Sequence, residues 1–194
     1  MDIKKHAESA DLGWGSLYYD VIPSLINRFN LKTMAEIGVA FAGHLEAILT
    51  NTKIEKSYAI DPYLLFDSST DSFSFENQNY TQANYDELFL FAKTRLDVFG
   101  DRVSFIKDTS VNASKSIMEN SLDIVFIDGE HTFEALKDDI QNWVPKVKKG
   151  GLISGHDYGH GNFPDVKRFI DEWVNENNYE LNVEKGYVWW VIKK

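Results

Sequence analysis

The sequence predicts an α/β fold: a doubly wound, Rossmann-like, mostly parallel seven-stranded sheet with a C-terminal antiparallel hairpin. Two observations predict this fold. Five short apolar runs each lead into a segment with helical periodicity, which is the alternation that builds a parallel sheet with right-handed crossovers. The chain then ends in two strand-like runs on either side of a glycine, as in a terminal hairpin. A length of 194 residues predicts a single domain, residues 1–194.

The composition narrows the classes of partner. A formal net charge of −10 argues against nucleic acid as a partner, because clustered Lys and Arg usually drive binding to a phosphate backbone. The absence of cysteine excludes disulfides and thiolate metal sites. No apolar run approaches the ~20 residues of a membrane span, and the first residues lack the apolar core of a signal peptide. We therefore expect a cytoplasmic protein that binds no membrane and has exposed aromatic side chains able to form a homo-oligomer interface.

Residues 1–32 are expected to form an N-terminal helical cap. Apolar side chains recur at four-residue spacing between residues 16 and 30, which predicts a helix with one apolar face through Leu17, Val21, Leu25 and Phe29. Pro23 would either kink this helix or start a second one.

Three strand–helix units come next. The first strand, Met34–Ile37, leads through a glycine-containing loop into a helix, and the second, Tyr58–Ile60, ends at Asp61 and Pro62. The predicted third strand is Val103–Ile106. The helices expected after these strands pass through Leu45, Ile48 and Leu49, through residues 84–99, and through residues 111–119.

Residues 64–82 are polar and aromatic, with no sustained helical or strand period. Loops of this length are uncommon inside compact domains and are often functional, so we predict a lid or acceptor loop. A disordered insertion is the alternative, because Ser, Asn, Gln and Asp dominate the segment.

The second half of the chain supplies the remaining elements. A fourth strand, Ile124–Ile127, precedes a helix from Phe133 to about Val144, and the glycine pair before LISG leads into a fifth strand. A helix from about Val166 to Asn175 and the terminal hairpin complete the fold.

The fourth strand is β-branched and aromatic without polar alternation, as expected for a strand covered on both faces. Ligands of parallel sheets collect at the carboxyl ends of the strands. Asp128 and His131 follow the fourth strand, and His156 and Asp157 follow the fifth, so the two pairs should meet. Carboxylate and imidazole together can bind a divalent ion, although each residue alone would fit an ordinary surface turn.

The stretch EIGVAFAG, residues 36–43, offers a second site. A glycine after the first strand allows close approach of a ligand, and the following helix presents amide groups suited to a carboxylate or phosphate. The pattern is not GxGxxG, which disfavours a dinucleotide site. Asp61, after the second strand, suits the paired hydroxyls of a ribose; alternatively, it caps the turn before Pro62.

These stretches, with FIDGEHTFEALKDDIQNWVPKVKKGGLISGHDY and FPDVKRFI, resemble class I S-adenosylmethionine-dependent methyltransferases over about residues 33–170. The specific resemblance is to the small-molecule O-methyltransferase branch that includes macrocin-type enzymes. It implies S-adenosylmethionine as cofactor and a small hydroxyl compound as acceptor. The cofactor residues that it implies are Glu36 and Gly38 at the methionine end, Asp61 at the ribose, and Asp108 with Ser110 near the adenine.

The same resemblance implies a metal-assisted reaction. Asp128, which also borders the cofactor, His156 and Asp157 match the metal-ligand positions of metal-dependent relatives, with Mg²⁺ or another divalent metal as the expected ion. His131 falls where some relatives carry a catalytic lysine, so it is the candidate general base, with Asp128 as the other catalytic residue. The family usually has a small hydroxyl residue where His44 stands.

Two other functions remain open. Iron-dependent hydroxylases of the cephalosporin hydroxylase type resemble the same block, and two histidines with a carboxylate are ligands suited to iron. The third candidate is a non-catalytic module that only binds the cofactor.

Overall fold

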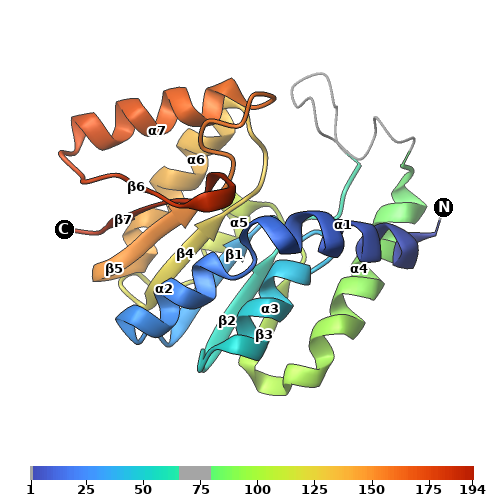
Figure 1. Ribbon diagram of the computed structural model, residues 1–194. Helices are drawn as coiled ribbons and strands as arrows, with labels where there is room; N and C mark the ends of the chain where they lie inside the picture. The colour runs from blue at the N-terminus through green and yellow to red at the C-terminus, as the bar shows by residue number, and fades with distance from the viewer. Residues whose placement is uncertain (1, 66–79) are drawn as a thin grey trace.

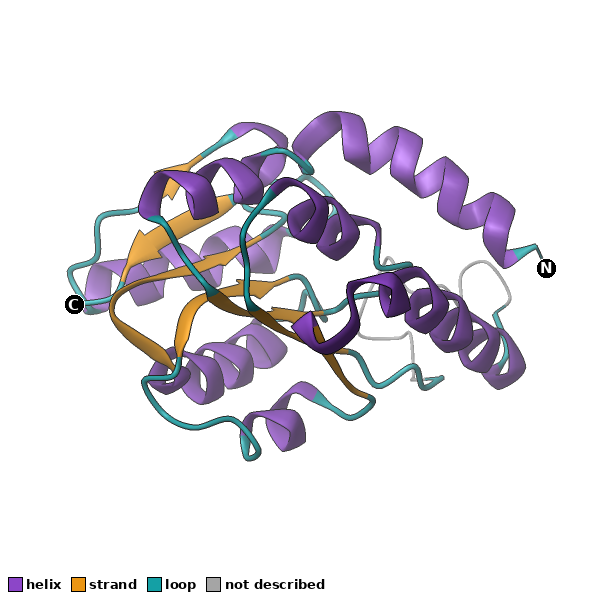
Figure 2. Ribbon diagram, turned by 90° about the horizontal axis from the view of Figure 1, so that it is seen from below, coloured by secondary structure: helices purple, strands orange, loops and turns teal. Residues whose placement is uncertain are grey.

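The computed structural model describes residues 2–65 and 80–194. One seven-stranded sheet lies between two layers of helices (Figures 1 and 2), which confirms the predicted fold. Its strands are β1 (Thr33–Ile37), β2 (Lys56–Ile60), β3 (Val103–Ile106), β4 (Leu122–Ile127), β5 (Val147–Gly155), β6 (Asn182–Val183) and β7 (Trp189–Ile192). Most of the predicted lid, residues 64–82, lies outside the described residues.

The strand order is β3-β2-β1-β4-β5-β7-β6. The first five strands pair in parallel, and β7 pairs antiparallel with both β5 and β6, so the terminal hairpin is confirmed. Because β1 and β4 are central and parallel, their carboxyl ends meet at one edge, with Ile37 opposite Ile127. The site residues predicted after these strands therefore start from adjacent backbone.

The helices divide between the two faces of the sheet. Those packed in one apolar cluster are α1 (Ile3–Tyr18), α2 (Val21–Phe29), α3 (Gly43–Asn51) and α4 (Gln82–Leu96). Those in the other are α5 (Ser110–Ser114), α6 (Phe133–Trp143) and α7 (Pro164–Glu176). Among the described residues, the short 3-10 helices η2 (Asp97–Arg102), η3 (Val144–Lys146) and η4 (Lys185–Tyr187) connect the regular elements.

The position of strand β4 between two helical layers explains why its sequence does not alternate between apolar and polar residues. Ile124 and Phe126 point into the core beneath α1–α4, whereas Val125 and Ile127 point into the core beneath α5–α7. All four side chains are buried because both faces of the strand are covered.

Of the two arrangements predicted around Pro23, the structure has two separate helices rather than one kinked helix. Helix α1 ends at Tyr18 and α2 begins at Val21, which puts Pro23 in the first turn of α2, where its missing N–H breaks no helical hydrogen bond. Leu17, predicted on the apolar face, is 52% exposed.

Two other helices are shorter than predicted. Helix α4 ends at Leu96, and Phe99 lies in η2 next to Gly100, whose φ of +55° does not fit a continuing helix. Helix α5 ends at Ser114, so the predicted helix over residues 111–119 is a single turn followed by irregular chain.

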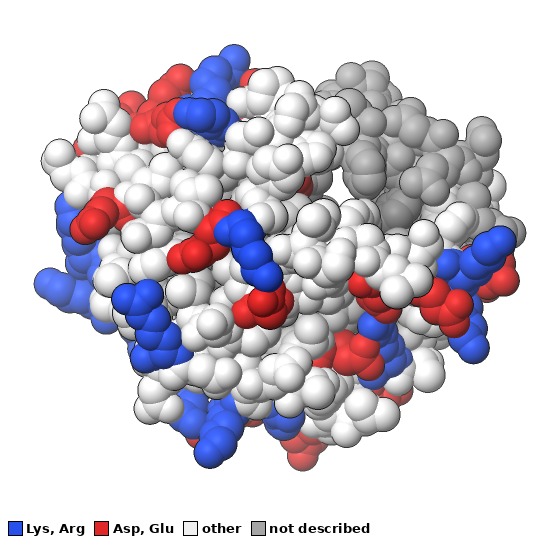
Figure 3. All heavy atoms as spheres, in the orientation of Figure 1, with Lys and Arg blue, Asp and Glu red and all other residues white. Residues whose placement is uncertain are grey.

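On the face shown in Figure 3, acidic and basic side chains are interspersed and form no broad field of one sign. None of the helices in the part of the chain that the structure describes has the length and apolar character that a membrane span needs.

Candidate active site

The fold brings Asp128, His131, His156 and Asp157 together. Strands β4 and β5 are parallel neighbours with Ile127 opposite Gly155, so the loops that follow them leave the sheet side by side. Oδ2 of Asp157 lies 2.9 Å from Nε2 of His131 and 3.1 Å from Nδ1 of His156. Oδ1 of Asp128 lies 3.9 and 3.5 Å from the same two nitrogens. Two carboxylates thus share two imidazoles, as the sequence predicts.

Three of these residues form a possible donor set for a metal ion. One ligand atom each from Asp128, His131 and Asp157 lies within 4.8 Å of the other two. Two oxygens and one nitrogen suit Mg²⁺, Mn²⁺ or Fe²⁺. The set includes His131, predicted as the general base, rather than His156, predicted as a ligand. The assignment of these roles remains a prediction.

The charges in this cluster stabilise one another. Burial disfavours the imidazolium form of His156, but the Asp128 and Asp157 carboxylates outweigh burial and raise its pKa to about 10. Burial likewise disfavours both carboxylates, and the neighbouring imidazoles outweigh it, so the pKa values of Asp128 and Asp157 lie below their usual range. The cluster therefore keeps both carboxylates ionised, as a cation site requires.

An aromatic turn packs against the cluster. Phe163, just before α7, stacks on the ring of His131 with centroids 3.9 Å apart and an interplanar angle of 16°. His160 stacks on the same phenylalanine at 5.2 Å. These contacts place the turn after β5 beside His131, where it forms one wall of the site.

The loop after β1 lies next to this cluster. Gly38 has a φ of +84°, and a side chain there would place its Cβ 2.0 Å from the backbone oxygen of Asp128. Glycine at this position therefore lets the β1 loop pass directly against the turn after β4.

Glu36, at the end of β1, is 2% exposed, and its Oε2 lies 3.4 Å from Nδ1 of His44. Neither this oxygen nor either ring nitrogen of His44 has a hydrogen-bond partner among the described residues. Burial raises the pKa of Glu36, and His44 opposes that rise. Buried polar atoms that make no hydrogen bond are costly, which points to a ligand that completes them.

Asp61, at the end of β2, binds backbone on both of its oxygens. The amide of Ala40 donates to Oδ2 at 3.0 Å, and that of Tyr63 donates to Oδ1 at 2.9 Å. The second bond is the turn cap considered from the sequence, and the first ties the β1 loop to β2. Its predicted contact with a ribose remains a prediction.

Asp108 and Ser110 follow strand β3. Asp108 is exposed and accepts hydrogen bonds from the Thr109 amide and the Asn112 side chain. The Ser110 hydroxyl donates to the Asp139 carboxyl and accepts from the indole N–H of Trp143 at 2.7 Å. Ser110 is thus engaged in the packing of α6.

Sequence reasoning missed two residues that the structure singles out. Tyr18 is 4% exposed and donates its hydroxyl hydrogen to Oδ2 of Asp128 at 3.4 Å. The direction of its side chain depends on where α1 ends, which the sequence pattern did not indicate. Asp139 is 5% exposed, and a sequence signal was present, because it shares a helical face with Leu136, Ile140 and Trp143.

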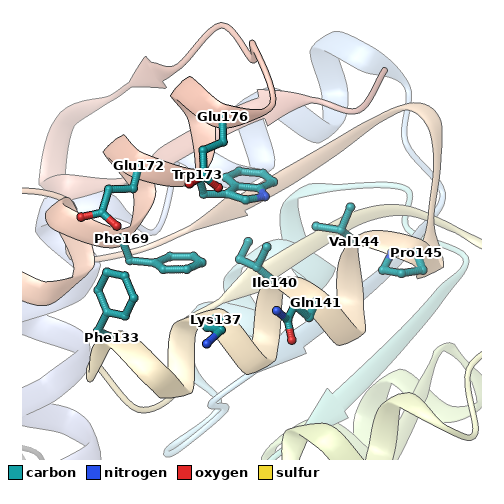
Figure 4. A pocket seen from close by; sticks show the side chains of 10 residues that line it. All are labelled: Phe133, Lys137, Ile140, Gln141, Val144, Pro145, Phe169, Glu172, Trp173 and Glu176. Atoms are coloured by element: carbon teal, nitrogen blue, oxygen red, sulfur yellow. The ribbon is translucent and has the colours of Figure 1, made fainter.

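A separate groove of about 430 Å³ runs between α6 and α7 (Figure 4). Its floor is apolar, with Ile140, Phe169 and Trp173 facing one another, and Lys137 and Glu172 lie at its rim. The groove is not part of the candidate site, because it is not lined by any of the four residues of the strand-end cluster, which are Asp128, His131, His156 and Asp157.

Comparisons with known proteins identify the family of the chain. Residues 35–158 match the methyltransferase domain family. An uncharacterized protein of Acanthamoeba polyphaga mimivirus is 26% identical over an alignment of 148 residues, and the match covers 73% of this chain and 59% of that protein. The chain therefore spans about three fifths of the length of this relative.

Solved structures share the fold at low identity. A protein from Staphylococcus aureus assigned as a caffeoyl-CoA O-methyltransferase superimposes with a TM-score of 0.67 at 16% identity, covering 100% of this chain and 93% of that one. The O-methyltransferase NovP gives 0.61 at 18% identity, covering 87% and 75%.

The family match extends from within β1 to just past β5, and so it contains both the β1 loop and the whole strand-end cluster. The chain belongs to the methyltransferase domain family.

Proposed function

We propose that this methyltransferase transfers a methyl group from S-adenosylmethionine to a hydroxyl of a small-molecule acceptor, with the help of a divalent cation. The observation that carries the proposal is the cluster of two carboxylates and two imidazoles at the carboxyl ends of β4 and β5. It lies directly against the β1 loop, so a cofactor held there and an acceptor held by the cluster would be neighbours. The names of the structural neighbours support oxygen as the methylated atom.

The residues of the β1 loop fit the amino-acid end of this cofactor. Oε2 of Glu36 is buried without a hydrogen-bond partner among the described residues, and an ammonium group would supply both a donor and a compensating charge. We assign Glu36 and Gly38 to this end, Asp61 to the ribose and Asp108 with Ser110 to the adenine. Asp128 borders both the cofactor and the cation.

The donor set fits a divalent ion as well. Asp128 and Asp157 supply ionised oxygens, and one imidazole completes the set. A bound cation would lower the pKa of an acceptor hydroxyl, and the cofactor supplies a methyl group on a sulfonium that is already activated toward an oxygen nucleophile.

The protein's own contribution is orientation and proton removal. The two carboxylates fix where the acceptor oxygen is held, and Phe163 limits the approach from one side. The imidazole that does not complete the donor set would accept the hydroxyl proton at a ring nitrogen. The two carboxylates otherwise hold His156 in its protonated form, so His156 could act as the base only where a bound cation has displaced that proton. Donor-atom geometry favours His131 as the ligand, whereas the family resemblance favours His156 as the ligand and His131 as the base.

Calorimetry on the full-length protein tests the proposal. S-adenosylhomocysteine and Mn²⁺ should each bind, and Asp157→Asn should lose Mn²⁺ binding while it keeps S-adenosylhomocysteine binding. Asp138→Asn, an exposed aspartate on α6, is the matched control and should change neither affinity. The absence of any S-adenosylhomocysteine binding would contradict the proposed reaction, and the absence of Mn²⁺ binding alone would remove only the cation.

One observation favours an iron-dependent hydroxylase as the second candidate. Both imidazoles approach the same carboxylate oxygen of Asp157, at 2.9 and 3.1 Å, and two histidines with one carboxylate are ligands suited to iron. Metal analysis of the purified protein separates the two functions: iron together with oxygen consumption supports hydroxylation, whereas dependence on Mg²⁺ or Mn²⁺ supports methyl transfer.

A further inference from the structure

Tyr18, the last residue of α1, reaches into the strand-end cluster from outside the family match. The match begins at residue 35, so nothing in it assigns a role to α1. Leu17 is 52% exposed, whereas Tyr18 is 4% exposed and donates its hydroxyl hydrogen to Oδ2 of Asp128 at 3.4 Å. The last residue of α1 is thus buried in contact with Asp128, which follows β4.

The ring of Tyr18 contacts two histidines. It stacks on His156 with centroids 4.0 Å apart and an interplanar angle of 28°. It also lies against His44 of α3, with centroids 5.2 Å apart and the planes tilted by 50°. The Tyr18 side chain therefore contacts both the strand-end cluster, through His156, and His44, which faces Glu36.

These contacts restrict two groups that matter for the cluster. The Asp128 carboxylate has two oxygens, and the Tyr18 hydroxyl occupies Oδ2 while Oδ1 faces His131 and His156 at 3.9 and 3.5 Å. A donor on one oxygen opposes rotation of the carboxylate about its last bond. The stacked ring likewise limits rotation of His156, whose Nδ1 faces both carboxylates.

Helix α1 is itself fixed in place by charge. It packs against α3, α4 and η4 (Figure 1). Arg95 of α4 donates to Asp11 of α1 at 2.8 Å and to Glu46 of α3 at 2.6 Å, and its guanidinium is largely buried. This bridge ties together three helices of the layer that α1 to α4 form.

Two glycines leave the space that α1 occupies. A side chain at Gly43 would place its Cβ 2.1 Å from Oδ1 of Asp11, and one at Gly186 would place it 2.7 Å from Cβ of Tyr18. Close backbone approach on two sides therefore sets the position of the tyrosine.

We propose that Tyr18 is a positioning residue of the active site, which holds Asp128 and His156 in the orientation that binds the cation, and that α1 is thus part of the catalytic unit. This inference rests on the proposed function for the roles of Asp128 and His156. Tyr18 itself makes no contact that transfers a proton or a methyl group.

Tyr18→Phe in the full-length protein tests the hydroxyl, with Tyr19→Phe as the matched control. Loss of the hydrogen bond that holds the Asp128 carboxylate should weaken Mn²⁺ binding about 10-fold in Tyr18→Phe and less than about 2-fold in Tyr19→Phe. The affinity for S-adenosylhomocysteine should stay within about 2-fold of the wild type in both. A Tyr18→Phe protein that binds Mn²⁺ as the wild type does, and is only less stable, would overturn the proposal.

A second readout does not depend on the cation. In chelator-treated protein labelled with ¹³C-histidine, Tyr18→Phe should shift the ring resonances of His156 and His131, because the Asp128 carboxylate is free to rotate, while Tyr19→Phe should not. The His156→Gln variant assigns the His156 resonances. Unchanged resonances in Tyr18→Phe would refute the positioning role of Tyr18. A wild type that binds no Mn²⁺ would remove the cation from the proposed function, but this resonance test would still apply. Gly186→Ala, which presses on Tyr18 from η4, gives an independent perturbation that should shift the same resonances.

Discussion

Nε2 of His131 lies 2.9 Å from Oδ2 of Asp157, although the two side chains follow different strands. That distance fits two arrangements: both atoms bind one cation, or the carboxylate orients the imidazole as a base. The two arrangements predict different losses of Mn²⁺ affinity when either histidine of the cluster is substituted.

The first prediction concerns which histidine binds the cation. If His131 completes the donor set, His131→Ala should weaken Mn²⁺ binding by about 100-fold or more, and His156→Ala by about 10-fold, the size of effect typical for groups that only support ligands. Calorimetry in parallel titrations measures both affinities. His160→Ala removes a ring that stacks on Phe163 and should leave Mn²⁺ affinity unchanged. The opposite ranking would make His131 the base.

The second prediction concerns the buried carboxylate of Glu36. Glu36→Gln removes an ionisable group whose pKa burial has raised, so the unliganded protein should become more stable at pH 8. The same change should weaken S-adenosylhomocysteine binding about 10-fold, because an ammonium group loses its charged partner. Urea denaturation and calorimetry measure the two effects.

Glu55→Gln is the control for this prediction. Its carboxylate pairs with Lys32 at the surface and is 71% exposed, so neither stability nor affinity should change appreciably. A Glu36→Gln protein that is less stable, with unaltered affinity, would show that the carboxylate serves the fold rather than a ligand.

The third prediction is a pH dependence that comes from Asp139. Burial raises the pKa of Asp139 to about 7, against the bond from Ser110. The folded state therefore keeps a proton that the unfolded state releases near pH 4. Between these values the folded state binds more protons, so the free energy of unfolding falls as pH rises from about 4 to about 7 and is level above that.

Asp139→Asn should remove this slope and stabilise the protein at pH 8, relative to the wild type, by about 2–4 kcal/mol. Urea denaturation at pH 5 and pH 8 measures it. Asp138→Asn, next to it but exposed on α6, should keep the wild-type slope. Parallel curves for the wild type and Asp139→Asn would mean that Asp139 is ionised in the folded protein.

The fourth prediction separates backbone strain from contact with Tyr18. Gly186 and Gly100 have φ values of +63° and +55°, but only an added Cβ at Gly186 meets other atoms. Alanine at either position should cost about 1 kcal/mol through its left-handed conformation. Gly186→Ala should cost about 1–3 kcal/mol more and should also weaken Mn²⁺ binding, because Tyr18 must move. Equal losses of stability with equal Mn²⁺ affinities would contradict the close approach.

The sheet was predictable because its signal is local. Ile124–Ile127 carries an unbroken apolar run since helices cover both faces of β4, and such runs before helical periodicity define parallel strands. The meeting of Asp128 with His156 and Asp157 followed from parallel pairing of β4 and β5.

The roles within the site were not predictable from the same signals. Whether His131 or His156 faces a cation depends on side-chain directions after two loops, and these are set by stacking on Phe163 and Tyr18. The burial of Tyr18 depends on where α1 stops, and the periodicity of residues 16–30 did not decide between one kinked helix and two helices.

The arrangement of α1 has a consequence for divergence among related chains. Substitutions in the first eighteen residues do not change the sequence of the strands or of the β1 loop. They can nevertheless move or replace Tyr18, whose hydroxyl donates to Asp128. Chains with the same sheet and the same strand-end residues would then differ in cation affinity because of a segment that a comparison restricted to residues 35–158 does not include.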